Sequence, residues 1–378
     1  MIEPNTFIDW LADAGVTNYV GVPDSLLKSL ALTIDSHPRV EHHVIAANEG
    51  AAVGFAVGVY LESAKPAAVY LQNSGLGNAV NPLTALAHRE VYGSPMVLII
   101  GWRGEPGRPD EPQHMVQGRV TRELLEIIDV PFVVMDQRDD RARDQVRSLV
   151  QSMQHSPGPV AIIVPAGTFD NAKTTKSATT EFPMTREEAL FEVLSVIPKG
   201  DRIIATTGML GRELWEIRKK GGQPTENDFL VVGGMGHASA IAHGAATANP
   251  DTKVWCLDGD GSLIMHLGSL TVIGNTRPTN LKHVVFNNYS HDSVGGQATA
   301  ANSVDFEGLC RSVQYNWGGS TANRSDIHGL VLNLADTLGP ALLELKVKKG
   351  ARSDLGRPPT EVFTPGTHFP PKISVRTL

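Results

Sequence analysis

The sequence has few cysteines, few aromatic side chains and no excess of positive charge, and these shortages exclude several classes of protein. Its 378 residues include two cysteines, Cys256 and Cys310, which are too few for a disulfide framework and favour a reducing, cytoplasmic setting. With 33 basic and 40 acidic residues the formal net charge is −7. Electrostatics therefore gives no reason to expect a nucleic-acid or membrane-surface partner.

Long apolar runs are also missing. The longest helical apolar stretch, Ala51–Leu61, is far shorter than the roughly 20 residues that span a bilayer, so we expect no membrane-spanning segment. The segment Met1–Trp10 contains Glu3 and Asp9 and lacks the basic-then-apolar pattern of a secretory leader. Hydrophobic residues at 41% and charged residues at 19% are typical of a globular chain, and the length favours two domains.

What the sequence does contain is an alternation of strand and helix patterns in each half. Helical patterns such as Thr121–Ile128 and Arg141–Met153 separate strands in the first half, and a helix over Arg186–Val196 opens the second. Strands interleaved with helices predict parallel sheets covered on both faces, so we expect two doubly wound α/β domains. The expected strands are Tyr19–Val22, His43–Ala46, Ala67–Leu71, Met96–Gly101, Phe132–Met135, Val160–Val164, Ile203–Thr206, Phe229–Val232, Val254–Leu257, Leu281–Phe286 and Ala341–Val347.

One segment interrupts this alternation. Gly167–Pro183 is rich in polar, β-branched and proline residues, which is typical of an interdomain linker. We expect a first domain over residues 1–168, a linker over residues 169–184 and a second domain over residues 185–349. Prolines disfavour a long helix from residue 350 onward, so residues 350–378 are expected to form an extended tail.

An aspartate and an asparagine follow two successive strands of the second half. Asp260 comes directly after the strand Val254–Leu257, and Asn288 follows the strand Leu281–Phe286. A helix is expected between them, over Ser262–Val272. Because a right-handed crossover places both strand ends on one edge of the sheet, Asp260 and Asn288 can meet in space.

The residue types at this edge suit a hard cation beside phosphate groups. Carboxylate, amide and backbone oxygens are ligands for Mg²⁺ and Ca²⁺, and Mn²⁺ accepts the same set. The helix that opens at Gly261 and Ser262 adds unpaired backbone N–H groups and the positive end of the helix dipole, which favour phosphate oxygens. The pattern therefore predicts a site for a metal and a diphosphate.

The first half carries an acidic residue at a junction between a strand and a helix. Glu49 opens a helical stretch in which Gly50, Gly54 and Gly58 recur at every fourth position. Small residues at this spacing form a smooth stripe on a helix, which another helix or a cofactor can approach closely. A glutamate in the first turn also complements the helix dipole, so a structural role and a functional role are both open here.

Together, the GDG motif of Gly259–Gly261, the following pair Asn287–Asn288 and the isolated Glu49 resemble the thiamine diphosphate-dependent enzymes. The resemblance implies that Asp260, Asn288 and the main-chain carbonyl of Ser290 bind Mg²⁺. It also implies that Glu49 acts on the pyrimidine ring of thiamine diphosphate. The first half would then be the pyrimidine-binding domain and the second the diphosphate-binding domain.

The same resemblance implies further contacts to the cofactor. Met235 would prop the coenzyme in a bent form, and the carbonyl of Gly233 would hold its amine. Because the two domains of such a site come from different subunits, a homodimer or a higher homo-oligomer is implied, with Glu49 acting across the interface. The other cofactor-binding candidates are Asn73, Gly75, Gly208, Gly259, Gly261 and Ser262.

A finer resemblance concerns the substrate, a small 2-oxo acid. Six blocks resemble the phosphonopyruvate decarboxylases, with the sulfopyruvate decarboxylases as near relatives: Gly21–Lys28, Leu71–Leu83, Asp110–Thr121, Thr206–Leu214, Gly233–Gly244 and His291–Thr299. Tyr289 and Ser290 stand where glycine and alanine are expected, and Ala298 replaces an expected proline. These departures lie beside the substrate end of the site and leave another 2-oxo acid open as the substrate.

Candidates for the remaining roles come from polar residues inside these blocks. In addition to Glu49, we expect Asp24, His114 and His291 to take part in proton transfer, since carboxylates and imidazoles serve as acids or bases. Substrate binding is expected from Asn73, Ser74, Asn78, Gln113 and Asp292. Arg352 and Arg357 in the tail could pair with a phosphonate through bidentate contacts, although solvated tail charges are the commoner case.

Two other classes of protein fit the sequence less well. A nucleotide-dependent oxidoreductase needs G-x-G-x-x-G after its first strand, and the glycine-containing segments Gly21–Leu27 and Gly233–Ser239 do not fit that pattern. A non-catalytic relative would keep the fold and lose one of Glu49, Asp260 or Asn288. All three are present, which favours catalysis.

Overall fold

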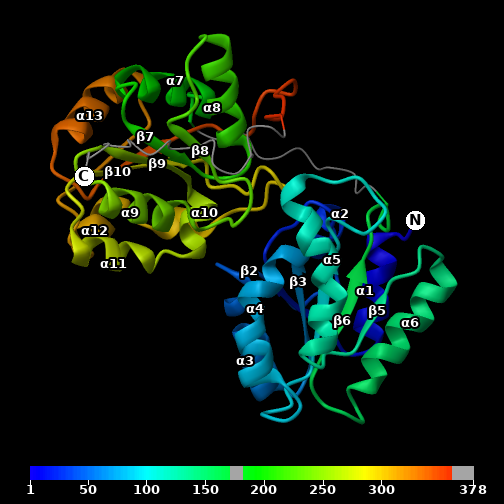
Figure 1. Ribbon diagram of the computed structural model, residues 1–378. Helices are drawn as coiled ribbons and strands as arrows, with labels where there is room; N and C mark the ends of the chain where they lie inside the picture. Colours follow the sequence, from blue (N-terminus) through cyan, green and yellow to red (C-terminus); the bar gives the residue numbers. More distant parts are fainter. Residues whose placement is uncertain (171–181, 360–378) are drawn as a thin grey trace, which may run out of the picture. The chain divides into compact units, whose positions relative to one another are not determined.

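Each half of the chain forms one parallel six-stranded sheet with helices on both faces (Figure 1). The computed structural model describes residues 1–170 and 182–359. The chain divides into two units, one comprising Met1–Ser177 and Ser293–Ala298, the other Ala178–Asp292 and Thr299–Leu378. The predicted fold class, two doubly wound α/β sheets, is confirmed.

The first sheet is built from β1 (Asn18–Gly21), β2 (His42–Ile45), β3 (Ala67–Gln72), β4 (Met96–Gly101), β5 (Phe132–Val134) and β6 (Pro159–Val164). Its strand order is β2-β1-β3-β4-β6-β5, and its pairings are parallel. The direction of winding reverses between β1 and β3. Open α/β sheets bind ligands beyond the carboxyl ends of the strands at such a reversal.

The second sheet is built from β7 (Arg202–Ala205), β8 (Asp228–Leu230), β9 (Val254–Gly259), β10 (Leu281–Asn287), β11 (Trp317–Thr321) and β12 (Ala341–Lys346). Its order, β11-β12-β10-β9-β7-β8, is that of the first sheet read from the opposite edge. The winding therefore reverses between β7 and β9, the counterparts of β1 and β3. The two halves share one topology.

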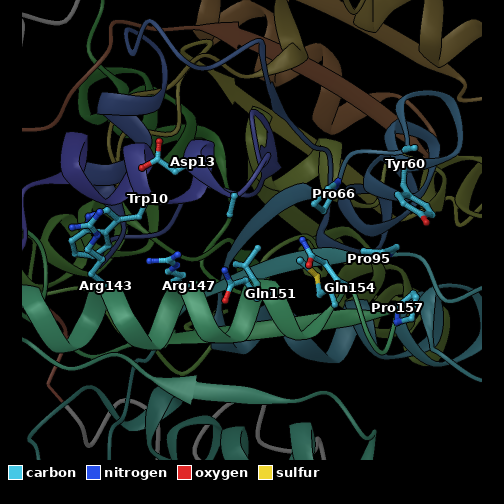
Figure 2. A pocket seen from close by; sticks show the side chains of 14 residues that line it. Trp10, Asp13, Tyr60, Pro66, Pro95, Arg143, Arg147, Gln151, Gln154 and Pro157 are labelled. Atoms are coloured by element: carbon cyan, nitrogen blue, oxygen red, sulfur yellow. The ribbon is translucent and has the colours of Figure 1, made fainter.

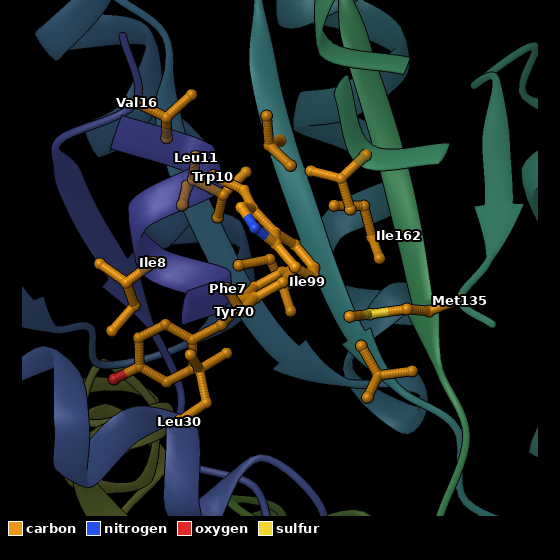
Figure 3. Packing of buried hydrophobic residues seen from close by; sticks show 14 of the residues in the cluster. Phe7, Ile8, Trp10, Leu11, Val16, Leu30, Tyr70, Ile99, Met135 and Ile162 are labelled. Atoms are coloured by element: carbon orange, nitrogen blue, oxygen red, sulfur yellow. The ribbon is translucent and has the colours of Figure 1, made fainter. Parts of the chain in front are cut away.

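The first sheet is buried by two groups of helices. One face packs against α1 (Pro4–Asp13), α2 (Lys28–Ile34) and α6 (Asp139–Ser152), and the other against α3 (Glu49–Ser63), α4 (Leu76–Pro82) and α5 (Pro112–Ile127). Figure 3 shows Phe7 and Trp10 of α1 directed toward Tyr70, Ile99 and Ile162 of the strands. Because both faces are covered, the central strands are continuous apolar runs, and every residue of β4 is buried.

The second sheet is covered in the same way. One face packs against α7 (Arg186–Val196), α8 (Met209–Lys220) and α13 (Arg324–Asp336). The other packs against α9 (Ala238–Ala248), α10 (Asp260–Met265), α11 (Ser269–Thr276) and α12 (Phe306–Ser312). α7 begins where its sequence predicts, because Thr185 and Glu188 form a reciprocal capping box at its first turn.

Three sequence predictions need correction. The helix expected over Ser262–Val272 is two helices, α10 and α11, separated by a turn in which the ring nitrogen Nδ1 of His266 lies 3.3 Å from the carbonyl oxygen of Gly236. The helix expected over Thr121–Ile128 begins earlier, at Pro112. It contains Gly118, where glycine is required because a Cβ would lie 1.7 Å from the carbonyl oxygen of Gly104. The edge strand β11 was missed, because two glycines weakened its strand pattern.

Parts of the expected linker and tail, residues 171–181 and 360–378, lie outside the described residues. Phe169, the first residue of the expected linker, pairs with Ile2 of the first unit in an isolated parallel bridge. Within residues 1–170 and 182–359, no helix is both long and apolar enough to cross a bilayer.

Gly274 of α11 offers a test of helix packing in the second unit. A Cβ at Gly274 would lie 1.6 Å from the carbonyl oxygen of Val313, the residue that ends α12, so α11 or α12 must shift to admit alanine. We expect Gly274→Ala to lower the free energy of unfolding by about 1–3 kcal/mol, the usual cost of overpacking.

The matched control is Gly244→Ala in α9, where a Cβ meets nothing within 4 Å. Alanine there should stabilise the helix by about 0.5–1 kcal/mol. Equilibrium urea unfolding followed by circular dichroism measures both changes. Equal effects of the two substitutions would contradict the close approach at Gly274.

Candidate active site

Residues predicted to carry the chemistry of the first unit follow β1, β2 and β3, at the carboxyl edge of the first sheet. Asp24 follows β1, Glu49 follows β2 and begins α3, and Asn73 follows β3. β1 and β3 are the two strands between which the winding reverses. The topology therefore gathers these side chains at the position where such sheets bind ligands.

Glu49 is buried, and its carboxylate is enclosed by residues of the next loop. Its side chain is 6% exposed, and its Oε2 accepts a hydrogen bond of 2.9 Å from Nδ2 of Asn78. A Cβ added at Gly75 would lie 2.3 Å from Oε1 of Glu49, so the main chain at Gly75 lies against the carboxylate. Asn48 caps α3 by accepting from the backbone N–H of Ala51, which fixes the helix turn that carries Glu49.

Asn73 is occupied by internal hydrogen bonds. Its Nδ2 donates to the carbonyl oxygen of Arg103 at 2.8 Å and to Oγ1 of Thr121 at 2.9 Å, and its Oδ1 accepts from the backbone N–H of Arg103. Both amide hydrogens are therefore used. Beside it, the exposed Ser74 accepts from Nε2 of Gln72 through its hydroxyl oxygen. Asn73 thus ties the loop after β3 to the loop after β4.

Asp24 is a buried carboxyl with an incomplete set of hydrogen bonds. Its Oδ2 accepts from the backbone N–H groups of Leu26 and Leu27, while its Oδ1 has no partner in the described structure. Burial raises its pKa to about 6, against the lowering effects of these N–H groups and of Arg103. A Cβ at Gly101 would lie 2.1 Å from Oδ2, so a glycine is needed beside this carboxyl.

A charged network lies around Arg103, which follows β4. Arg103 donates to both carboxylate oxygens of Asp110 and to the hydroxyl of Ser25. Burial opposes ionisation of Asp110, but hydrogen bonds from Arg103 and from two backbone N–H groups hold its pKa well below its usual range. Arg103 was not predicted from the sequence. Its position directly after a buried strand, at the carboxyl edge of the sheet, is a signal that could have identified it.

Two candidate residues in the first turn of α5, Gln113 and His114, contact the same carboxylate, that of Glu111. Gln113 donates to Oε2 of Glu111 at 2.7 Å, and Nε2 of the buried His114 lies 3.6 Å from the same oxygen. Glu111 is the residue that precedes α5. Gln113 and His114 thus lie together, and both are oriented by Glu111.

In the second unit, Asp260 lies where the strand β9 turns into α10, and it is buried at 3% exposure. Oγ1 of Thr299 donates to its Oδ2 at 2.5 Å. Burial raises the pKa of Asp260 to about 6, although hydrogen bonds from Thr299 and from the backbone N–H groups of Gly261 and Asn288 lower it. Its carboxylate is therefore next to the end of β10, where the crossover argument places it.

Asn288 and Ser290 form a tight turn after β10. Oδ1 of Asn288 accepts from the backbone N–H of Ser290 at 3.0 Å, and its Nδ2 donates to Oδ2 of Asp292 at 2.5 Å. Tyr289 between them has a φ of 57°, a left-handed conformation that glycine adopts more easily. Both Asn288 and Ser290 are buried, and the hydroxyl of Ser290 has no partner in the described structure.

Asp292 belongs to a buried charge network. Besides Asn288, its Oδ2 accepts from the backbone N–H of Gly350 at 2.8 Å and lies 3.6 Å from Nη1 of Arg186. Arg186 also donates to both carboxylate oxygens of Glu213, at 2.8 and 3.0 Å. These bonds hold Asp292 in place and direct its carboxylate at the amide of Asn288, which favours a positioning role over direct substrate binding.

The glycine-rich loop before α9 is attached to the start of α10. Oγ of Ser262 accepts from Oγ1 of Thr206 at 2.8 Å and from the backbone N–H of Gly236 at 3.1 Å. Gly236 has a φ of 90°, and the half-buried Met235 precedes it. The loop of Gly233 and Met235 therefore lies on the same edge as Asp260.

The other second-unit candidates surround this edge. Gly208 precedes α8 with a φ of 89°, a conformation that requires glycine. A Cβ at Gly261 would lie 2.8 Å from the ring of His291, so the imidazole lies directly on the start of α10. Burial lowers the pKa of His291 to about 4, against the raising effect of Asp292, so this imidazole is neutral at physiological pH.

Some predicted residues lie elsewhere. Arg352 forms ion pairs with Glu187, Glu216 and Asp354, which lie in the same unit. Its guanidinium is therefore already paired with carboxylates. Thr299, which donates to Asp260, was not singled out, although it ends the block His291–Thr299, because it lies 39 positions from Asp260 along the chain.

A cavity of about 680 Å³ in the first unit lies away from these residues (Figure 2). Among its lining residues, Pro66, Pro95 and Pro157 precede β3, β4 and β6, so the cavity is at the amino ends of the strands. Trp10, Arg143 and other side chains of α1 and α6 complete its wall. The predicted chemistry belongs to the opposite edge, and this cavity does not contain it.

The residues present fit thiamine diphosphate and a divalent cation. Asp260 is buried, and the hydrogen bonds that chiefly lower its pKa come from neutral donors, the hydroxyl of Thr299 and backbone N–H groups. A buried carboxylate in this state is suited to a metal ion. The first turn of α10 supplies backbone N–H groups for phosphate, and Glu49 supplies a buried acid at the edge of the other sheet.

Comparisons with known proteins agree with this fit. Residues 5–125 match the family described as thiamine pyrophosphate enzyme, N-terminal TPP binding domain, and residues 206–345 match the corresponding C-terminal TPP binding domain. The first match contains Glu49, and the second contains Asp260 and Asn288.

Relatives of known function extend over nearly the whole chain. Phosphonopyruvate decarboxylase from Streptomyces viridochromogenes is 33% identical over 96% of this chain and 93% of that protein. The enzyme of the same name from Streptomyces hygroscopicus is 31% identical over 95% of this chain and 90% of that protein. The alpha subunit of sulfopyruvate decarboxylase from Methanothermobacter thermautotrophicus is 31% identical over 41% of this chain and 90% of the subunit. The chain therefore belongs to the phosphonopyruvate decarboxylase family of thiamine diphosphate-dependent carboxy-lyases.

Proposed function

We propose that this enzyme decarboxylates 3-phosphonopyruvate to phosphonoacetaldehyde and CO2, using thiamine diphosphate and Mg²⁺, as a step of phosphonate biosynthesis. The observation that carries the proposal is a pair of buried acids, Glu49 and Asp260, each at the carboxyl edge of its sheet. The full-length similarity to two phosphonopyruvate decarboxylases supports the choice of substrate. When bound, thiamine diphosphate supplies the nucleophilic carbon and accepts the electrons released as CO2 leaves.

The second unit would hold the metal and the diphosphate. Asp260 would contribute a carboxylate oxygen, Asn288 its amide oxygen and Ser290 its main-chain carbonyl to Mg²⁺. Asp292 accepts from the amide nitrogen of Asn288 and so fixes the orientation of that amide; its Oδ1 accepts from the backbone N–H of Ser290 and has a second lone pair for the metal. Such outer contacts set ligand orientation and matter for metal affinity. The backbone at Gly259, Gly261 and Ser262 would face the phosphates, and Gly208 would permit close approach.

The first unit would hold the pyrimidine ring. Glu49 would share a proton with a ring nitrogen, which is the step that makes the neighbouring amine basic. Asn78 and the main chain at Gly75 fix the Glu49 carboxylate, so little reorganisation is required when the proton moves. Met235 and the carbonyl of Gly233 would support the bent cofactor from the loop before α9.

A homodimer would complete each site. The helix α3, which begins with Glu49, exposes Ala51, Gly54, Phe55, Gly58 and Leu61. Phe55 is 39% exposed and Leu61 is 74% exposed, which is unusual for large apolar residues on a helix that is apolar all round. Pairing of this face with a second copy would bury it and bring Glu49 to the partner's site.

The remaining candidates would handle the substrate and its protons. Asp24, with a pKa raised to about 6 by burial, is suited to give and take a proton near neutral pH. His291 is neutral and lies beside Asp260, and His114 and Gln113 are held by Glu111. Ser74 and Asn78 would face the substrate, while Asn73 would position their loop.

The alternative is sulfopyruvate or another 2-oxo acid. The similarity to the alpha subunit of sulfopyruvate decarboxylase favours it. Tyr289 and Ser290 also depart from the expected residues beside the metal site. Phosphonate and sulfonate differ in charge, so kinetics will separate the two.

The substrate assignment is tested by steady-state kinetics with thiamine diphosphate and Mg²⁺. We expect kcat/KM for 3-phosphonopyruvate to exceed that for sulfopyruvate and for pyruvate by at least about tenfold, because the lost phosphonate contacts are worth more than 1 kcal/mol. Aldehyde formation and CO2 release are the readouts. A higher kcat/KM with sulfopyruvate would establish the alternative, and no turnover of any 2-oxo acid would refute decarboxylation.

Replacement of Glu49 by glutamine tests the proton-sharing role. The Glu49→Gln side chain keeps the shape of the acid but cannot share its proton, so kcat should fall by about 10²–10⁴-fold. Cofactor affinity, measured by calorimetry, should change little.

The control is Glu126→Gln, an exposed glutamate of α5 outside the proposed site and dimer face, which should leave kcat unchanged. Near-normal turnover by the Glu49→Gln enzyme would exclude the proposed role.

Removal of Asp260 tests the metal site. In Asp260→Ala the Mg²⁺-dependent affinity for thiamine diphosphate should fall at least about 10–100-fold, because a direct ligand contributes no less than an outer-shell partner. Titration calorimetry at fixed Mg²⁺ gives the affinity. The exposed Asp251, which precedes β9, provides the control Asp251→Ala. If both variants bind the cofactor equally well, the metal is bound elsewhere.

A further inference from the structure

A second group of metal-ligating side chains lies in the core of the second unit. Cys256 and Asp258 alternate along β9 and so share one face of the sheet. His283 of β10 is the register partner of Cys256 and lies on the same face. This face is the one covered by α9, α10, α11 and α12. We refer to Cys256, Asp258 and His283 as the β9–β10 cluster.

The cluster is compact and inaccessible to solvent. One ligand atom from each residue lies within 4.8 Å of the ligand atoms of the other two. Nε2 of His283 is 3.7 Å from Oδ2 of Asp258. The exposures are 0% for Cys256, 0% for Asp258 and 1% for His283. Three groups able to bind a metal therefore converge inside a largely apolar core.

Several polar atoms of the cluster lack partners. In the described part of the chain, Oδ2 of Asp258 and both ring nitrogens of His283 make no hydrogen bond, and Asp258 uses only Oδ1, to accept from Gly259. The nearby hydroxyl of Tyr315 is also unpartnered, and its pKa is raised by burial and by Cys256 and Cys310. Each orphaned buried group costs about 1–3 kcal/mol, so an occupant that satisfies several at once is strongly favoured.

We propose that the β9–β10 cluster binds a structural divalent transition-metal ion, with Zn²⁺ as the best match. A thiolate, an imidazole and a carboxylate form a mixed S, N, O donor set that suits Zn²⁺, whereas Mg²⁺ prefers oxygen alone. On binding, the thiol of Cys256 loses its proton to solvent and the sulfur bonds to the metal. The thiolate and the carboxylate balance the two positive charges, so the buried site is neutral overall.

An ion pair between Asp258 and a protonated His283, without a metal, would satisfy fewer of the unpartnered atoms of the cluster. The 3.7 Å separation is longer than a hydrogen bond, and the pair leaves Nδ1 of His283 without a partner. A buried pair of charges also recovers little of its desolvation cost without further hydrogen bonds. A metal ion at the centre of the cluster engages the carboxylate, a ring nitrogen and the thiol together.

The site would brace two strands whose ends carry the catalytic metal ligands. Asp258 is two positions before Asp260, and His283 is on the strand that ends at Asn287, beside Asn288. A metal joining β9 to β10 would fix the spacing of these ends without touching cofactor or substrate. The proposal does not depend on the proposed substrate.

Cobalt substitution provides the test, because a thiolate bound to Co²⁺ gives an intense near-ultraviolet charge-transfer band and oxygen ligands do not. The full-length protein is produced in minimal medium with Co²⁺ or Zn²⁺, since a buried metal enters as the chain folds. It is then purified without an affinity tag and dialysed against excess Mg²⁺. We expect stoichiometric retained Zn²⁺ by elemental analysis, and the thiolate band in the cobalt form.

The two cysteines of the chain make a matched pair of variants. Cys256→Ser should abolish the thiolate band and lower metal retention by more than about tenfold. Cys310→Ser, a substitution at the other buried cysteine, should leave both unchanged. Loss of the band in Cys310→Ser with retention in Cys256→Ser would overturn the assignment.

The wild-type protein decides the question even if a variant fails to fold. A wild-type chain without the thiolate band and without retained Zn²⁺ would refute the site. That result would leave the Glu49 and Asp260 experiments untouched, because those report on cofactor binding and turnover.

Discussion

Strands joined by crossover connections run parallel and so present their carboxyl ends at one edge of the sheet, and both halves of this chain depend on that constraint. It brings Asp24, Glu49 and Asn73 to one edge of the first sheet, and Asp260 and Asn288 to one edge of the second. The two sheets use the same strand order, so each has its reversal of winding at an equivalent place. The candidate residues are distributed over two copies of one topology.

Burial of acidic groups at these edges is the main electrostatic feature of the protein. Asp24 and Asp260 both have pKa values raised to about 6, chiefly because the surrounding structure excludes water. Such groups oppose folding when ionised, and they persist at sites where a ligand or a proton compensates them. Asp110 and Glu213 are different, because each accepts two hydrogen bonds from one arginine, Arg103 or Arg186. These paired acids stabilise the structure, whereas the unpaired buried acids are candidates for binding and proton transfer.

Sequence patterns predicted the sheets well because buried parallel strands are continuous apolar runs, as in β4. They failed where tertiary contacts override local preference. Gly318 and Gly319 disguise β11, yet a Cβ at Gly318 would lie 2.7 Å from Cβ of Cys310, so glycine is required for α12 to pack there. The break between α10 and α11 likewise depends on a contact of His266 with a distant loop.

The candidate site was predictable as a set of positions but not as a set of roles. The order of strands and the motifs locate Glu49, Asp260 and Asn288, since these follow strand ends. The sequence cannot reveal that the amide hydrogens of Asn73 are already used, or that Thr299 holds Asp260, because those facts arise from contacts between distant segments. The fold class followed from the alternation of strand and helix patterns and the cofactor class from the resemblance, whereas the partners of each side chain required coordinates.

The repetition of one topology in a single polypeptide also bears on how the enzyme is encoded. Proteins named as the alpha and beta subunits of sulfopyruvate decarboxylase match 41% and 32% of this chain. Because one polypeptide carries both sheets, the two domains are made in equal number at synthesis. The covalent link also gives each half a permanently high local concentration of the other, an advantage that grows as the cell makes less of the enzyme.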